Sequence, residues 1–181
     1  LVEEFDVDGA PNWLFYMLDG ETDDVDVYTE DGQIVFEMLA EYAATVFLYD
    51  PYTYKDSYLE TTVENRGTND YYFGLVSRYS DDGYYLFLVN PSGFYGIWKW
   101  TPSEGYNMLR TGASASVNTG KDTNLIAAET KGPKLTLWVN GKELWDLEDK
   151  ELKEGQVGIV VVGFEDLPIT AEFNYVVIDE P

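Results

Sequence analysis

The sequence predicts an all-β fold in which two antiparallel sheets pack together as a sandwich or jelly roll. Three observations support this: alternating, β-branched and aromatic runs recur at short intervals, turn residues separate them, and no segment carries a helical stripe of apolar residues. The 181 residues, 45% of them hydrophobic, are enough to bury a sizeable core. We therefore expect a single domain over residues 1–181.

The expected strands follow one another along the whole chain. They lie near residues 12–18, 25–29, 33–40, 44–48, 58–65, 71–79, 84–90, 94–100, 123–130, 134–139, 142–146, 155–162 and 169–178. Turn signals between them include Asp31-Gly32, Asp82-Gly83, Pro91-Ser92-Gly93, Gly132-Pro133 and Asn140-Gly141. So many strands in one domain require two packed sheets. The Gly-, Ser- and Thr-rich segment 101–121 is the longest expected loop, and 147–154 is a charged connection.

The region 71–100 contains eleven aromatic residues and is expected to form three strands joined by two hairpins. Loops of two or four residues would place Arg78 opposite Tyr85, and Tyr85 opposite Trp98. One face then carries Gly74, Val76, Arg78, Tyr85, Phe87, Gly96, Trp98 and Trp100. The other face, which is more apolar and better suited to the core between the sheets, carries Phe73, Leu75, Leu86, Leu88, Tyr95 and Ile97. Three-residue loops would turn the middle strand over but would leave Arg78 and Trp98 on one side.

The first of these faces is a candidate binding surface. Flat aromatic rings beside an arginine donor suit sugars, whose C–H groups pack on a ring while their hydroxyls form hydrogen bonds. Glycine within a strand permits close approach by a ligand or by another backbone. The candidate ligand-binding residues are Arg78, Tyr85, Trp98, Trp100, Gly74 and Gly96. The alternative is that a loop such as 101–121 covers these rings and makes them a second small core.

A second hairpin is expected in LTLWVNGKELW, residues 135–145. Its Asn140-Gly141 tip is the strongest short-range signal for a type I′ turn. This turn would pair Leu137 with Leu144 and Trp138 with Glu143.

Charge and composition exclude several classes of function. The balance of 34 acidic against 11 basic residues gives a net charge of −23, which repels nucleic acids and anionic lipid surfaces. Most of this charge is interpreted as a solvated coat. No apolar run is long enough to insert directly into a membrane. Cysteine and histidine are absent, which excludes disulfides, thiolate nucleophiles and a Ser-His triad.

Acidic clusters offer two candidate sites for a structural Ca²⁺, the one metal that the sequence suggests. DGETDDVDVYTEDG, residues 19–32, contains Asp19, Asp23 and Asp24, which supply the hard oxygen ligands that Ca²⁺ prefers. The segment does not fit the EF-hand pattern, and a solvated acidic loop is the simpler interpretation. The second candidate site is Asp6, Asp8 and Asp179, if the two terminal strands pair. No other cofactor is expected.

Three stretches carry a resemblance to a known superfamily. They are YYFGLVSRYSDDGYYLFLVNPSGFYGIWK, TNLIAAETKGPKLTLWVNGKELWDLEDKELKEGQVGIVV and ITAEFNYVVI. Their order resembles the laminin-G-like branch of the concanavalin A-like lectin/glucanase superfamily, and in particular the family-16-glycoside-hydrolase-like or 3-keto-disaccharide hydrolase domains of exported prokaryotic proteins. The resemblance implies a jelly roll whose curved sheet binds carbohydrate, in a protein placed outside the cytoplasm.

The chain departs from that superfamily where catalysis would lie. Its glucanases use a Glu-x-Asp-x-Glu or Glu-x-Asp-x-x-Glu strand, which places the carboxylates on one face. The nearest strings here are EFDVD at residues 4–8, which ends in Asp, and ELWDLE at 143–148, whose spacing puts Glu143 and Asp146 on opposite faces. The sequence therefore leans away from an enzyme.

Three functions follow from these observations. We favour, narrowly, a non-catalytic extracellular carbohydrate-binding module whose partner is a glycan or polysaccharide. The second is a structural or adhesive domain of a cell-surface or filament protein, which would contact neighbouring domains or subunits. The third is a glycoside hydrolase or related sugar-active enzyme, which requires two carboxyl groups roughly 5 to 9.5 Å apart in the groove of the curved sheet. An extracellular or cell-surface location is expected for all three.

Overall fold

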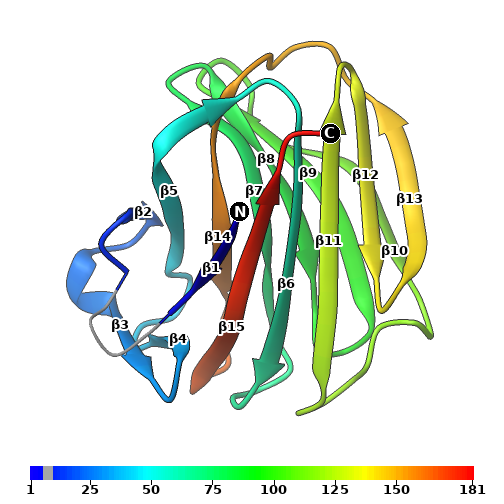
Figure 1. Ribbon diagram of the computed structural model, residues 1–181. Coiled ribbons are helices and arrows are strands. Elements are labelled where there is room, and N and C mark those ends of the chain that lie inside the picture. Colours follow the sequence, from blue (N-terminus) through cyan, green and yellow to red (C-terminus); the bar gives the residue numbers. More distant parts are fainter. Residues whose placement is uncertain (6–9) are drawn as a thin grey trace.

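Two antiparallel sheets pack face to face in the computed structural model, which describes residues 1–5 and 10–181 (Figure 1). A single 3₁₀ turn, η1 (Thr22–Asp24), interrupts the strands of this part of the chain. The strands are β1 (Val2–Glu4), β2 (Trp13–Asp19), β3 (Val25–Glu30), β4 (Gln33–Met38), β5 (Ala44–Tyr54), β6 (Ser57–Asn65), β7 (Tyr71–Ser80), β8 (Gly83–Val89), β9 (Phe94–Thr101), β10 (Gly105–Ala113), β11 (Thr123–Lys131), β12 (Lys134–Val139), β13 (Lys142–Glu148), β14 (Gly155–Gly163) and β15 (Ile169–Asp179). The predicted all-β sandwich is confirmed.

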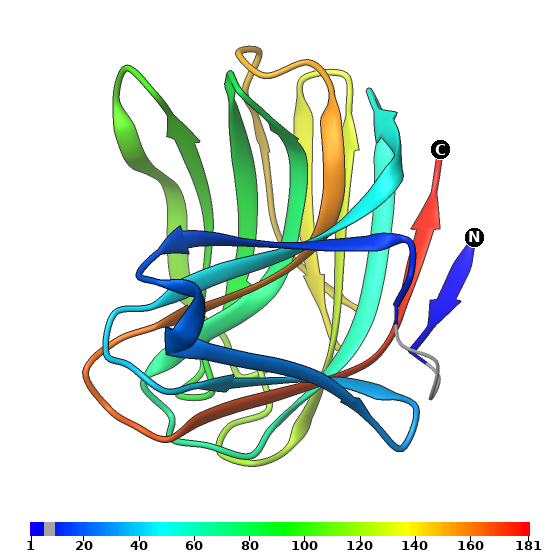
Figure 2. The ribbon, with the colours of Figure 1, turned by 90° about the vertical axis from the view of Figure 1, so that its left-hand side faces the viewer.

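The two sheets have different strand orders. Sheet I runs β13-β12-β11-β6-β15-β4-β3, and β1 pairs with β15, so the two ends of the chain lie side by side in both views. Sheet II runs β10-β9-β8-β7-β14-β5-β2. Figure 2 shows β5 and β14 curving strongly along their length. β15 of sheet I bends along its length as well, so strands of both sheets are curved.

Every strand that the sequence predicts is present, and two more strands were not predicted. β1 is only three residues long, too short for an alternating pattern to be visible. β10 lies inside the segment 101–121, so the expectation of a loop there is wrong for residues 105–113. Its sequence, GYNMLRTGA, is rich in polar residues and glycine, but its backbone pairs with β9 from Gly105 to Ala113 with one register shift, which makes β10 the edge strand of sheet II. Pairing with a neighbouring strand overrides its weak intrinsic preference.

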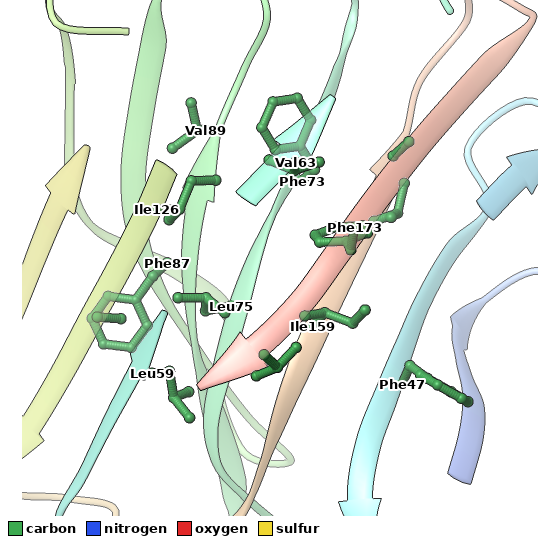
Figure 3. Close-up of a cluster of buried hydrophobic side chains, with 14 of the residues drawn as sticks. Phe47, Leu59, Val63, Phe73, Leu75, Phe87, Val89, Ile126, Ile159 and Phe173 are labelled. Carbon is green, nitrogen blue, oxygen red and sulfur yellow. The ribbon is translucent and has the colours of Figure 1, made fainter. Parts of the chain in front are cut away.

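The main core fills the space between the sheets. Sheet I contributes Leu59, Val63, Ile126 and Phe173, and sheet II contributes Phe73, Leu75, Phe87 and Ile159 (Figure 3). All eight have 0% of their surface exposed to solvent. Burial of such side chains is worth about 1.5–3 kcal/mol each before conformational entropy is subtracted. This core holds the two sheets in a fixed relation.

A second apolar cluster, which we call the outer cluster, covers the face of sheet II that points away from sheet I. Its buried members are Val46, Leu48, Val76, Tyr84, Leu86, Leu88 and Val160. Aromatic side chains that are partly exposed pack against it, namely Tyr72, Tyr79, Trp98 and Trp100. An outer sheet face that needs its own apolar covering is unusual for an antiparallel sandwich, in which this face is commonly polar.

Candidate binding groove on the outer face of sheet II

A β-bulge at Arg78 changes the strand register that the sequence predicts. Ser80 pairs with Gly83 as a two-residue loop requires, but Ser77, not Arg78, lies opposite Tyr85. Arg78 is the extra residue, and its φ of 53° lies in the left-handed region. The predicted pairing of Arg78 with Tyr85 is therefore wrong. An alternating pattern reveals no bulge, because it records side-chain types and not backbone conformation.

The second hairpin also differs from the predicted register. Asn90 N–H donates to the Phe94 carbonyl at 2.8 Å, which leaves Pro91, Ser92 and Gly93 as a three-residue loop. Leu86, not Tyr85, consequently lies opposite Trp98. The middle strand is turned over relative to the favoured register, so Phe87 lies in the core between the sheets (Figure 3).

Arg78 is buried, and its guanidinium ties three chain segments together. Only 2% of the residue is exposed. Nε and Nη2 donate to the Lys55 carbonyl at 2.9 and 2.7 Å, Nη1 to the Leu152 carbonyl at 2.9 Å, and Nη2 to the Gly132 carbonyl at 2.7 Å. Asp56 Oδ1 lies 3.5 Å from Nη2. Arg78 therefore does not stand beside Trp98, and no ligand on the outer face reaches it.

Tyr85 likewise points into the sandwich, where it fastens the connection that follows β13. Its hydroxyl donates to Asp149 Oδ1 at 2.5 Å and accepts from Leu152 N–H at 3.2 Å. Lys99 Nζ donates to Asp149 Oδ2 at 2.9 Å. Burial raises the pKa of Asp149, but the hydrogen bonds from Tyr85, the Glu151 N–H and Lys99 outweigh burial and hold that pKa below its ordinary value. The Tyr85 hydroxyl is thus bound to Asp149, and its side chain does not lie on the outer face.

The two predicted site glycines accommodate atoms of this chain. A Cβ on Gly74 would lie 1.9 Å from the Phe87 carbonyl oxygen, where the neighbouring strand folds over it. A Cβ on Gly96 would lie 2.6 Å from Nε1 of Trp98, whose indole lies against the strand. A glycine within a strand permits close approach either by a ligand or by another group of the same chain. The second explanation applies to Gly74 and to Gly96.

Trp98 and Trp100 do lie on the outer face, and most of the rings around them pack against one another. Trp100 stacks on Tyr84 with ring centroids 5.2 Å apart, and Tyr84 stacks on Tyr79 at the same distance. Tyr106 from β10 reaches over this row, with its hydroxyl 2.9 Å from that of Tyr84. This part of the face therefore matches the alternative that the sequence left open, in which the rings form a second small core. Most of the covering groups are other aromatic rings and not a loop.

Beside that row, the outer face contains a small hollow of about 180 Å³, which we call the deep hollow. It is lined by Asp19, Tyr42, Ala44, Tyr72, Leu86, Leu88, Trp98, Tyr106, Val162, Gly163 and Phe164. Trp98 Nε1 is buried and has no hydrogen-bond partner in the described part of the chain. Because an unpaired buried N–H is costly, this indole is a donor in need of an acceptor.

A wider hollow of about 520 Å³, the open hollow, adjoins the deep hollow at the end of the sandwich. Both are lined by Tyr42, Tyr72 and Phe164, and we call the two together the groove. The remaining walls of the open hollow come from the ends of strands and from loops, namely Asp70, Asn90, Ser92, Phe94 and Glu165. The groove therefore combines exposed rings with carboxylate, amide and hydroxyl groups.

The groove is acidic. Among residues 1–5 and 10–181, the charged residues that line it are Asp19, Asp70 and Glu165, and no lysine or arginine lines either hollow. Tyr42 donates a hydrogen bond to Glu165, and this bond, with a smaller contribution from burial, raises the pKa of Tyr42. Burial and the nearby Asp70 raise the pKa of Tyr72. Both hydroxyls are therefore protonated donors at neutral pH.

Tyr42 has a left-handed backbone, with a φ of 60°. Its N–H donates to the Phe164 carbonyl at 3.1 Å, and Gly163 N–H donates to the Ala43 carbonyl at 2.8 Å, so two loops hold this conformation. A residue with a side chain costs about 1–2 kcal/mol in this conformation. Strain of this kind is concentrated at functional sites. Tyr42 is 51% exposed and lines both hollows.

Sequence reasoning missed the loop residues of this groove. Tyr42, Phe94 and Phe164 lie in loops or at a strand end, where period-two alternation assigns no face. The signal that was available is the placement of large aromatic residues beside acidic ones in turn segments, as in Glu41-Tyr42 and Phe164-Glu165. A pattern of alternation within strands does not include this signal.

The strings closest to a glucanase motif lie away from the groove or outside the described residues. Glu143 and Asp146 belong to β13, the edge strand of sheet I. In the string EFDVD, residues 6–8 are outside the described residues. The outward side chains in the middle of sheet II are apolar, and the acidic groups of the groove come from the end of β2 and from loops.

The two candidate Ca²⁺ sites have different outcomes. Within residues 1–5 and 10–181, no group of three or more acidic side chains is placed to hold a metal ion, and Asp19, Asp23 and Asp24 form no such group. Asp24 Oδ2 instead accepts the Glu21 N–H at 2.8 Å. Asp6 and Asp8 lie outside the described residues, so a site shared with Asp179 remains a prediction. The same described ranges contain no helix with the length and apolar character needed to cross a membrane.

Comparison with known proteins identifies the fold. No protein-family model matches the chain, and no curated protein sequence matches it. Carbohydrate-binding module CBM66 from Bacillus subtilis is similar in structure, with 15% identity, a TM-score of 0.67, and 92% of this chain and 95% of that chain covered. A protein of unknown function with a galectin-like fold from Bacillus subtilis has 9% identity, a TM-score of 0.78 and coverage of 99% and 94%. A β-glucanase from Bacillus licheniformis has 9% identity, a TM-score of 0.71 and coverage of 100% and 98%. The chain therefore has the concanavalin A-like jelly-roll fold that the sequence resemblance implied.

Proposed function

We propose that the chain is a non-catalytic module that binds a carbohydrate in the groove of sheet II, outside the cytoplasm. The observation that carries this proposal is the meeting of exposed rings and polar groups in the two adjoining hollows. Rings such as Phe94, which is 49% exposed, offer a face to sugar C–H groups, while Asn90, Ser92 and the acidic residues offer hydrogen bonds to hydroxyls. In this proposal, loop residues take the ligand-binding role that the sequence indicated for Arg78 and Tyr85.

The names of structurally similar proteins support this proposal. One is a carbohydrate-binding module and another is a β-glucanase. Their low identity to this chain means that its own residues must carry the rest of the argument. Here the groove supplies rings and hydrogen-bonding groups, but the middle of sheet II supplies no row of carboxylates. Binding without hydrolysis is the function that these residues fit.

The charge of the groove restricts the class of sugar. Asp19, Asp70 and Glu165 would repel uronic acids and sulfated sugars, and the net charge of −23 adds to this repulsion. Neutral sugars meet no such penalty. We therefore expect neutral polysaccharides to bind and anionic polysaccharides not to bind.

The direct test is the replacement of one exposed ring of the groove. Phe94→Ala is expected to weaken binding to a neutral polysaccharide about tenfold, because roughly 1.4 kcal/mol of ring contact is lost. The ligand would be found by screening neutral and anionic polysaccharides in pull-down assays, and the loss measured by calorimetry. Tyr52→Ala is the matched control, since Tyr52 is 63% exposed and does not line either hollow. Absence of binding to any neutral glycan, or equal loss in both variants, would count against the proposal.

Tyr42→Gly is expected to separate stability from binding. Glycine adopts the left-handed φ of Tyr42 without the strain of a side chain, so the free energy of unfolding should rise by up to about 1 kcal/mol. Glycan affinity should fall, because a ring and a hydroxyl leave the groove. Thermal unfolding and calorimetry measure the two effects. A variant that binds normally would show that the strained tyrosine serves the loop and not the ligand.

A second function is favoured by the free edge of sheet II. β10 is an edge strand, and Tyr106 and Met108 on it are 48% and 54% exposed. Exposed apolar groups beside unpaired backbone suit contact with another domain or subunit, as a structural or adhesive unit requires. Size-exclusion chromatography with light scattering distinguishes the two functions, since a monomer at all accessible concentrations argues against assembly through this edge.

A further inference from the structure

The outer face of sheet I contains a pocket of about 170 Å³ that the proposed glycan groove does not use. Glu60 on β6, Ala127 on β11 and Trp138 on β12 pair in one row across three neighbouring strands. Because paired residues point to the same face, the methyl group of Ala127 stands between two much larger side chains. The short side chain in the middle of the row leaves the pocket open.

Aromatic rings form one corner of this pocket. The centroids of the Tyr58 and Trp138 rings are 6.4 Å apart, and the ring planes meet at 53°. Leu125 and Gly141 complete the lining, the latter in the turn of the β12–β13 hairpin. Tyr58 and Trp138 are partly exposed, whereas Ala127 at the floor is 5% exposed. Two inclined aromatic rings thus form one side of the pocket, and Ala127 forms its apolar floor.

A carboxylate held in place forms the remaining wall. Glu60 Oε2 accepts from the Tyr58 hydroxyl at 2.8 Å, and Oε1 accepts from the Tyr175 hydroxyl at 3.3 Å. Within the described residues, no lysine or arginine lies within ion-pair distance of Glu60. Glu129 pairs with Tyr58 and Glu143 with Trp138, so further negative charge borders the pocket. The described residues that line the pocket thus supply negative charge and aromatic faces, and none of them is a lysine or arginine.

We propose that this pocket binds an alkylammonium group, supplied either by a lysine side chain of a partner protein or by a free small amine. A cation is attracted to the face of a tryptophan or tyrosine ring, and the carboxylate adds direct electrostatic attraction. An ammonium fits better than a guanidinium. Bidentate pairing with arginine needs both oxygens of the carboxylate, and each already accepts a tyrosine hydroxyl, whereas a compact ammonium approaches from one side.

The test titrates ¹⁵N-labelled protein with n-butylammonium chloride and follows the Trp138 indole and Ala127 amide signals by NMR. Saturable shifts in the millimolar range are expected, at least tenfold weaker with 1-butanol, which has the same chain without the charge. Sodium chloride at equal ionic strength is the second control, because a chain with a net charge of −23 attracts every cation. Equal shifts with sodium chloride or 1-butanol, or tighter binding of a neutral sugar at these signals, would overturn the proposal.

Variants separate the pocket from general attraction. Ala127→Leu fills the gap and should abolish binding of butylammonium while Glu60 and Trp138 remain. Glu60→Gln should weaken it about tenfold, and Glu143→Gln, which removes a charge outside the lining, less than twofold. If Ala127→Leu does not fold, Trp138→Leu tests the same pocket. Unchanged affinity in Glu60→Gln overturns the proposal.

A second experiment distinguishes the two sources of the ammonium group, a lysine of a partner protein and a free small amine. The first ligand is a short peptide with an acetylated N-terminus and an amidated C-terminus, in which one lysine with a free side-chain ammonium is flanked by neutral residues. It is compared with the same peptide carrying norleucine in place of lysine, and both peptides are compared with butylammonium. Tighter binding of the lysine peptide than of butylammonium identifies a protein partner, and the reverse identifies a free amine; either result supports the ammonium site. Equal binding of the lysine and norleucine peptides contradicts it. The groove variant Phe94→Ala should leave all of these affinities unchanged, since Phe94 lines a hollow of the other sheet.

Discussion

Arg78→Met is expected to lower the free energy of unfolding by at least about 3 kcal/mol and to leave the glycan affinity of the folded protein unchanged. The substitution removes the guanidinium hydrogen bonds to the carbonyls of Lys55, Gly132 and Leu152, of which the bond to Leu152 is buried and the others are partly buried. Each lost hydrogen bond to a charged group costs about 1.5–3 kcal/mol. Methionine fills much of the volume, so the lost hydrogen bonds dominate the effect. Urea unfolding with matched m-values measures the difference.

Arg110→Met is the matched control for this prediction. Arg110 is also an arginine of sheet II, but it is exposed and lies over the Trp145 ring at 4.8 Å from the centroid. Loss of an exposed cation–π contact costs about 0.5–1 kcal/mol. The loss of unfolding free energy in Arg78→Lys should lie between those of Arg78→Met and Arg110→Met. One ammonium cannot reach the three carbonyls that a planar guanidinium spans. If Arg78→Met is stable but no longer binds glycan, the role first inferred from the sequence would be right and the structural role wrong.

The strands were predictable because each one has a local cause in the sequence. Alternating apolar residues and turn dipeptides such as Asn140-Gly141 act within a few residues, and both residues of that turn have the positive φ of a type I′ hairpin, 51° and 78°. Trp138 pairs with Glu143 as expected. One residue further the prediction is wrong: Leu137 lies opposite Trp145, not Leu144, because the register shifts there. Turn chemistry specifies the tip of a hairpin but not the irregularities beyond it.

The candidate site was less predictable because it depends on one backbone conformation and on loops. The bulge at Arg78 moves that side chain from the outer face into the sandwich, and neither composition nor spacing marks it. Trp98 and Trp100 were placed on the correct face, since their own strand is regular across those two residues. Tyr42, Phe94 and Phe164 meet only when loops from distant parts of the chain come together at one end of sheet II.

Gly74→Ala is expected to have the largest effect on stability of any substitution considered for the groove. A Cβ at this position would lie 1.9 Å from the Phe87 carbonyl oxygen and 3.2 Å from the Leu88 Cα, so the obstacle is the backbone of the neighbouring strand. Relief requires β7 and β8 to separate in the middle of sheet II, where Gly74 pairs with Leu88. Overpacking and a broken ladder together should cost more than about 3 kcal/mol, or a fall in Tm of roughly 6–12 °C for a chain of this size.

Two other glycines make this prediction specific. Gly105 has a φ of 69° and no atom within 4 Å of an added Cβ, so Gly105→Ala measures backbone strain alone, about 1 kcal/mol. At Gly96 the nearest obstacle is the Trp98 indole, a side chain that can turn away, so Gly96→Ala should cost less than Gly74→Ala but should alter the groove and weaken glycan binding. Thermal unfolding and calorimetry of the three variants measure these effects. A Gly74→Ala protein as stable as Gly105→Ala would mean that β7 and β8 tolerate the added methyl group, and ligand contact would again be the better reason for a glycine at that position.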